Sequence, residues 1–125
     1  MNMDIQKGAD VVAALDQAKV KVSVALFANL AEYGDWRLVL AARAFDQLEL
    51  RKAYGLVHDS LDAAGSDADK NLALFILPMT DPFIRELRKT FSKAFSKAKS
   101  EEGMRLGLQL IGGRFVDDAF VYRIR

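Results

Sequence analysis

Three segments of the chain, residues 9–19, 46–64 and 82–99, carry apolar side chains at the three-to-four-residue spacing of an amphipathic helix. The second segment opens with Asp46, which can accept hydrogen bonds from the free N–H groups of a first turn. The third follows Asp81 and starts with a proline, which is a typical helix start. The pattern therefore predicts three helices, of which 46–64 and 82–99 are the two main amphipathic ones.

Two other segments alternate between apolar and polar positions with the two-residue period of strands. Residues 20–44 alternate on both sides of a polar turn and predict a β-hairpin, with a helix through the alanine-rich stretch 25–31 as the alternative. Residues 104–124 alternate around Gly112-Gly113, a pair that suits a turn with two positive φ angles. We therefore expect a second hairpin at the end of the chain.

Residues 72–77 are uniformly apolar, which is typical of a central strand with both faces covered. The predicted order is helix, strand, strand, helix, strand, helix, strand, strand. This order indicates an α+β fold with a five-stranded, mostly antiparallel or mixed sheet and two main amphipathic helices packed on it. The strand–helix–strand connections would be right-handed crossovers where they join parallel neighbours. Without a repeat or a linker, residues 1–125 are expected to form a single domain.

Composition excludes several classes of protein. With 51% hydrophobic and 28% charged residues, the chain reads as globular and not disordered. It has no cysteine, which excludes disulfides, thiolate catalysis and cysteine-ligated zinc. The first seven residues lack the apolar core of a secretory signal, and the apolar run 72–79 is far shorter than the roughly 20 residues of a membrane-spanning helix. We therefore expect a soluble, cytoplasmic protein.

The formal net charge of +1 hides an uneven distribution, because the basic residues gather on the last predicted helix. Arg85, Lys89, Lys93 and Lys97 are spaced four apart and form one row along the segment 82–99. Such a row could bind the negatively charged backbone of a nucleic acid, or another polyanion. The alternative is a solvated helix face whose cations favour the C-terminal end of the helix dipole. No aromatic side chain lies within the basic row, which weakens the case for binding single-stranded nucleic acid.

His58 is the only histidine and the natural candidate for general acid–base chemistry. Tyr54 precedes it and Asp62 follows it by one helical turn, so Asp62 could orient the imidazole. Asp117 and Asp118 on the last strand are further candidates for a polar site. The alternative for His58 is an ordinary contact with a carboxylate on the rim of its helix. The alternative for Asp117 and Asp118 is that their charges prevent an edge strand from pairing with another sheet. No serine stands in a nucleophile elbow.

No metal site or cofactor is expected. The acids of residues 67–71 resemble the start of a calcium-binding loop, but Leu72 replaces the required glycine and Pro78 the required glutamate. The glycines do not form a phosphate-binding motif either.

The leading hypothesis is therefore a small non-catalytic module that acts through protein–protein contacts, with self-association as a homodimer or another homo-oligomer in first place. Its basis is the missing catalytic constellation, the high hydrophobic content and the hairpins, whose edges are available for pairing. The first alternative is nucleic-acid or polyanion binding through residues 82–99. The second is a small-ligand-binding or hydrolytic domain with its site near His58.

Overall fold

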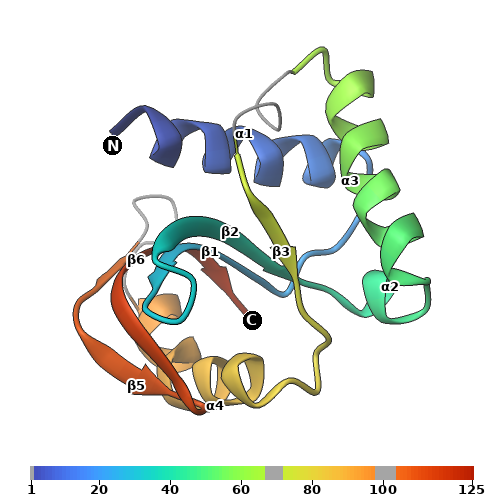
Figure 1. The fold of residues 1–125 in the computed structure, drawn as a ribbon. Helices are drawn as coiled ribbons and strands as arrows, with labels where there is room; N and C mark the ends of the chain where they lie inside the picture. Colours follow the sequence, from blue (N-terminus) through green and yellow to red (C-terminus); the bar gives the residue numbers. More distant parts are fainter. Residues whose placement is uncertain (1, 67–71, 98–103) are drawn as a thin grey trace.

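The computed structural model describes residues 2–66, 72–97 and 104–125, with only the backbone of 2–4, 92–97 and 104 (Figure 1). The expected polar loop 67–71 and the expected helix end at 98–99 lie outside these residues. The elements along the chain are α1 (Asn2–Gln17), β1 (Val24–Leu30), β2 (Asp35–Ala41), the short α2 (Arg43–Asp46), α3 (Leu50–Ala63), β3 (Leu74–Ile76), α4 (Pro82–Lys97), β4 (Met104–Leu106), β5 (Gln109–Ile111) and β6 (Arg114–Ile124).

The fold is α+β, as predicted, with a mixed sheet between two layers of helices. The strand order is β3-β2-β1-β6-β4, and β5 pairs with the other end of β6. Only β2 and β3 are parallel, and the other pairs are antiparallel. Helices α1 and α3 cover one face of the sheet and α4 covers the other (Figure 1). Each face therefore has its own apolar core.

The first hairpin is confirmed, and the alternative of a helix through 25–31 is wrong. In β1, Ala25 and Phe27 belong to the core under α1 and α3, while Leu26 and Ala28 belong to the core over α4. This strand, with both faces covered, lies at the centre of the sheet. The uniformly apolar β3 is instead an edge strand, contrary to our expectation. An apolar run indicates that both faces of a strand contact apolar layers. β3 packs against both cores, with Leu74 and Phe75 half-buried, although only one of its edges is paired.

The sheet has six strands where the sequence predicted five. The alternating segment 104–111 is divided into β4 and β5 at Gly107-Leu108, which belong to neither strand. Of the two strand–helix–strand connections, only that through α3 joins parallel neighbours. The one through α4 crosses from β3 at one edge to β4 at the other.

Helix boundaries differ from the prediction at two places. Helix α3 begins at Leu50, because the expected cap Asp46 ends α2 instead, and its carboxylate accepts a hydrogen bond from the Met79 N–H at 3.3 Å. The expected cap Asp81 is confirmed, since its Oδ1 accepts from the Phe83 N–H at 2.9 Å. Helix α1 begins about two turns before residue 9.

Candidate functional site

Exposed apolar side chains gather on the β5–β6 hairpin. Leu108, Leu110 and Phe115, which we call the hairpin patch, are 66%, 69% and 46% exposed. Single exposed apolar residues are common on protein surfaces, but a cluster is typical of a contact surface. Among the described residues the large apolar side chains with exposed surfaces number six, and three of them lie in this patch.

The register of the hairpin places Leu110 and Phe115 of the patch on the face of the sheet turned away from α4. Leu110 is directly opposite Phe115, so the two side chains lie on the same face. The next residue, Ile111, points the other way and is buried in the core over α4. Leu110 and Phe115 therefore extend into solvent from a strand pair whose opposite face is anchored in the protein.

The turn of the hairpin is held against the start of α4. Gly112 and Gly113 have φ angles of +53° and +84°, which confirms the predicted turn. A Cβ on Gly112 would lie 2.4 Å from the carbonyl oxygen of Pro82, so the two backbones meet with no room for a side chain. The turn of the hairpin thus packs directly against the first turn of α4.

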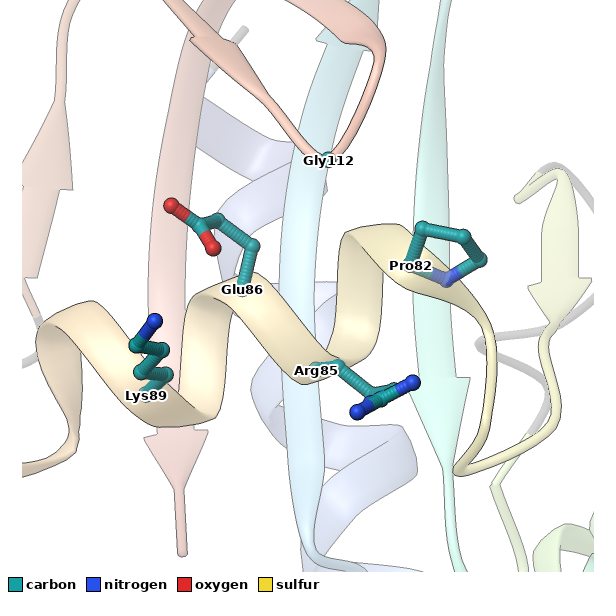
Figure 2. A pocket seen from close by; sticks show the side chains of 5 residues that line it. All are labelled: Pro82, Arg85, Glu86, Lys89 and Gly112. Atoms are coloured by element: carbon teal, nitrogen blue, oxygen red, sulfur yellow. The ribbon is translucent and has the colours of Figure 1, made fainter.

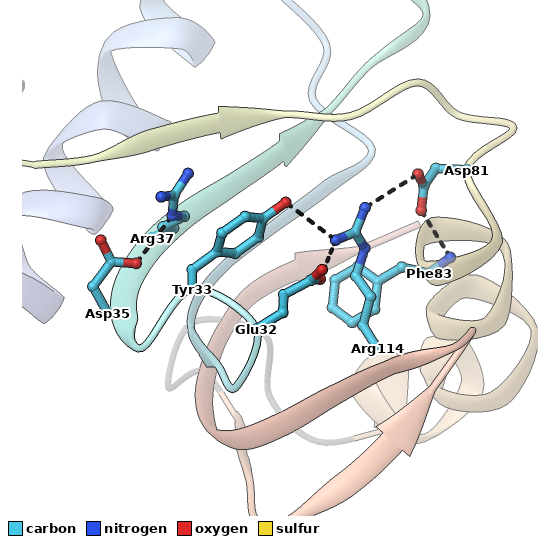
Figure 3. A network of polar contacts seen from close by, with 7 residues as sticks. All are labelled: Glu32, Tyr33, Asp35, Arg37, Asp81, Phe83 and Arg114. Atoms are coloured by element: carbon cyan, nitrogen blue, oxygen red, sulfur yellow. Dashed lines mark hydrogen bonds and ion pairs between the residues drawn. The ribbon is translucent and has the colours of Figure 1, made fainter.

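A polar network centred on Arg114 holds the same end of the hairpin from the side (Figure 3). The Arg114 guanidinium donates to the Glu32 carboxylate and to Tyr33 Oη, and lies 3.8 Å from a carboxylate oxygen of Asp81. It also stacks over the Phe75 ring, 5.3 Å from its centroid. Burial works to lower the pKa of Arg114, but the hydrogen bonds and the charges of Glu32 and Asp81 outweigh it and raise the pKa. This network joins the β1–β2 turn, α4 and β6.

The basic row predicted on α4 is placed only in part. Arg85 and Lys89 are exposed on α4, while the side chains of Lys93 and Lys97 lie outside the described residues. A pocket of about 370 Å³ between α4 and the β5–β6 turn is lined by Arg85, Glu86 and Lys89 together with Pro82 and Gly112 (Figure 2). Glu86 lies between Arg85 and Lys89 along α4 and lines the same pocket, so a carboxylate accompanies the two cations. Polyanion binding by this row stays a prediction.

Helix α3 carries Tyr54, His58 and Asp62, of which His58 and Asp62 are exposed. Tyr54 instead turns its hydroxyl to the edge strand β3, where Oη accepts from the Ile76 N–H at 3.1 Å and donates to the Leu74 carbonyl at 3.5 Å. Ligand binding or hydrolysis near His58 stays a prediction, and Tyr54 has a structural partner.

Asp117 and Asp118 lie on β6, which β1 and β2 separate from the strand that Tyr54 contacts. A register shift against β1 leaves Asp117 as the extra residue of a bulge, exposed to solvent. The Asp118 carboxylate accepts two hydrogen bonds from Arg105, at 3.1 and 2.5 Å. Because these bonds favour the charged form, they lower the pKa of Asp118 and raise that of Arg105. Asp118 therefore already has a basic partner on β4.

Within residues 2–66, 72–97 and 104–125, no group of three or more His, Asp or Glu side chains is arranged to hold a metal ion. No helix in the same part of the chain is long and apolar enough to cross a membrane.

The alternating pattern does not predict the hairpin patch. A single strand over residues 104–110 would place Leu106, Leu108 and Leu110 on one face, where all three would share the same burial. The structure buries Leu106 and exposes the other two, because the strand is broken at Gly107. A glycine inside an alternating segment was the available signal, since it often marks a bend or a bulge.

No protein-family model matches this sequence, and neither a curated protein nor a solved structure matches it.

Proposed function

We propose that this protein is a non-catalytic module that works by association of two copies through the hairpin patch. The observation that carries the proposal is the exposure of Leu108, Leu110 and Phe115 on a hairpin at the edge of the sheet. Covering these side chains on association would remove apolar surface from water, which is the main driving force of most protein–protein contacts.

The way the hairpin is held supports this proposal. The close contact of Gly112 with Pro82 and the network around Arg114 keep the patch in one orientation before any partner arrives. A surface that is already ordered loses little conformational entropy on binding. The exposed apolar side chains are therefore presented on a rigid support.

A second copy is the partner that the charges favour. Because the formal net charge is only +1, two copies repel each other weakly. The patch itself is uncharged, and an apolar surface is complementary to itself in a two-fold contact. Stable interfaces bury roughly 1,200–2,000 Å² in total, more than three side chains supply, so we expect a weak dimer whose population depends on concentration.

The test is the molar mass in solution, measured by size-exclusion chromatography with light scattering over a range of concentrations. The unmodified protein is expected to approach the dimer mass as concentration rises, and Leu110→Lys to remain monomeric, because a charge cannot be buried in the contact without a partner. Leu50→Lys is the matched control, since Leu50 is 60% exposed on α3, away from the hairpin. A monomer at every concentration would overturn the proposal, and so would dissociation by Leu50→Lys in place of Leu110→Lys.

A further inference from the structure

We infer that the two copies pair edge to edge through β5, as antiparallel strands related by a two-fold axis at Leu110, so that their sheets become continuous. This inference rests on the proposed function, because it specifies how the two copies meet. β5 is paired only with β6, and in the described part of the chain no segment pairs with its outer side. Its unpaired backbone groups are thus available to another strand.

The turn determines which backbone groups of β5 face outward. Gly112-Gly113 is a two-residue turn that joins Ile111 to Arg114, and the residues flanking such a turn exchange hydrogen bonds with each other. Hydrogen-bonded and non-hydrogen-bonded pairs alternate along antiparallel strands, so the next pair, Leu110 and Phe115, is non-hydrogen-bonded. The N–H and C=O of Leu110 therefore point away from β6, toward the open edge.

The two edges of the sheet differ in how they are protected. At β3 the outward N–H of Ile76 and the outward carbonyl of Leu74 are both bonded to the hydroxyl of Tyr54. β5 has no such cap from a described side chain, and its sequence, Gln109–Ile111, contains neither charge nor proline. Charged residues and proline are the residues that proteins commonly place in an edge strand to prevent it from pairing with another strand. The outer side of β5, which shares this edge of the sheet with β4, is thus open to strand addition.

A second copy fits this edge by symmetry. An antiparallel pair centred on Leu110 places this residue opposite its own copy, with two backbone hydrogen bonds between them and both side chains on the face that carries Phe115. Identical strands bring no like charges together here, because β5 has none. Each copy uses the same surface, so the contact closes as a dimer and does not propagate into a fibre.

The absence of cysteine makes this geometry testable with single substitutions. In the inferred dimer the two Leu110 Cα atoms would be about 5.5 Å apart, a separation that suits a disulfide. Leu108 would lie opposite Gly112 of the other copy, about 13 Å along the strand from its own counterpart. We therefore expect Leu110→Cys, with diamide as oxidant, to form a covalent dimer at least about tenfold faster than Leu108→Cys. Leu50→Cys is the control for random collisions.

The outcomes separate the inference from the proposed function. Rapid cross-linking of Leu110→Cys alone would support the two-fold pairing. If the unmodified protein dimerises but Leu108→Cys or Leu50→Cys cross-links as fast as Leu110→Cys, the pairing is wrong while association stands. If light scattering finds only monomer, both are wrong. Because Leu108, Leu110 and Leu50 are all exposed, these substitutions should leave the fold intact, which circular dichroism would verify.

Discussion

Gly8 determines how closely α1 approaches the sheet. It faces Tyr122 of β6, whose hydroxyl donates a hydrogen bond to the Ile5 carbonyl at 2.6 Å. A Cβ on Gly8 would lie 2.2 Å from that hydroxyl oxygen, well inside any allowed contact. Glycine in the middle of a helix usually reduces stability, so its presence here has a packing reason.

We expect Gly8→Ala to lower the free energy of unfolding by about 1–2 kcal/mol, because the Tyr122 ring must move and its hydrogen bond is lost. Gly55→Ala is the matched control. Gly55 also lies inside a helix, but nothing is within 4 Å of its missing Cβ. That substitution should raise stability by about 0.5–1 kcal/mol. Urea denaturation measures both, and equal effects of the two substitutions would contradict this account.

At the scale of elements, the β5–β6 hairpin depends on its contact with α4. Gly112 and Gly34 both have positive φ angles, of +53° and +66°, and each belongs to the turn of a hairpin. They differ in their surroundings, because the space beside Gly34 is open while Pro82 fills the space beside Gly112. The difference in the free energy of unfolding between Gly112→Ala and Gly34→Ala therefore reports the effect of the close contact, because the backbone strain is common to both.

We expect Gly112→Ala to be less stable than Gly34→Ala by about 1–3 kcal/mol, since two stretches of backbone cannot separate without moving the hairpin off α4. Both variants should also lose about 1–2 kcal/mol from the left-handed conformation of the new alanine. Denaturation curves for the two proteins give the comparison directly. If the two variants are equally stable, the hairpin is not held by this contact.

Helix α1 is tied to β6 at its other end by a charged pair. The Asp16 carboxylate accepts two hydrogen bonds from Arg123, both at 2.8 Å. These bonds lower the pKa of Asp16 and raise that of Arg123. Because the folded-state pKa of Asp16 lies below its unfolded value, this stabilisation is present above the unfolded pKa. It is lost as the pH falls through the folded pKa.

At the scale of the whole molecule, the two edges of the sheet differ in how far their backbone groups are already bonded. The hydroxyl of Tyr54 closes one edge at β3, and the hairpin leaves the other open at β5. A protein with one open edge can form a dimer, whereas one with two open edges can form longer assemblies.

We therefore expect Tyr54→Phe to lose about 1 kcal/mol of stability, because the Ile76 N–H and the Leu74 carbonyl lose their partner. It should also form species larger than a dimer in light scattering at high concentration. In the double variant with Leu110→Lys, association that persists would arise from the β3 edge. An unchanged stability together with an unchanged mass distribution would show that Tyr54 does not protect this edge.

The kinds of elements and their order could be predicted from the amino-acid sequence, because apolar periodicity and turn residues act over a few neighbouring positions. The hairpin at Gly112-Gly113 and the cap at Asp81 could be predicted in this way. The long-range contacts could not, since nothing local in Gly8 indicates that Tyr122 lies above it. The same holds for Tyr54, which sequence spacing associated with His58 and the fold associates with β3.

The three-dimensional fold was needed to show which strands lie at the edges of the sheet and which apolar residues stay exposed to water. Strand order depends on which segments the chain brings together over long distances, and periodicity does not encode that. The uniformly apolar β3 thus became an edge, while the alternating β1 became the centre. Leu110 has the sequence pattern of a buried residue, and it is exposed because its face of the hairpin extends beyond the helices that cover the sheet.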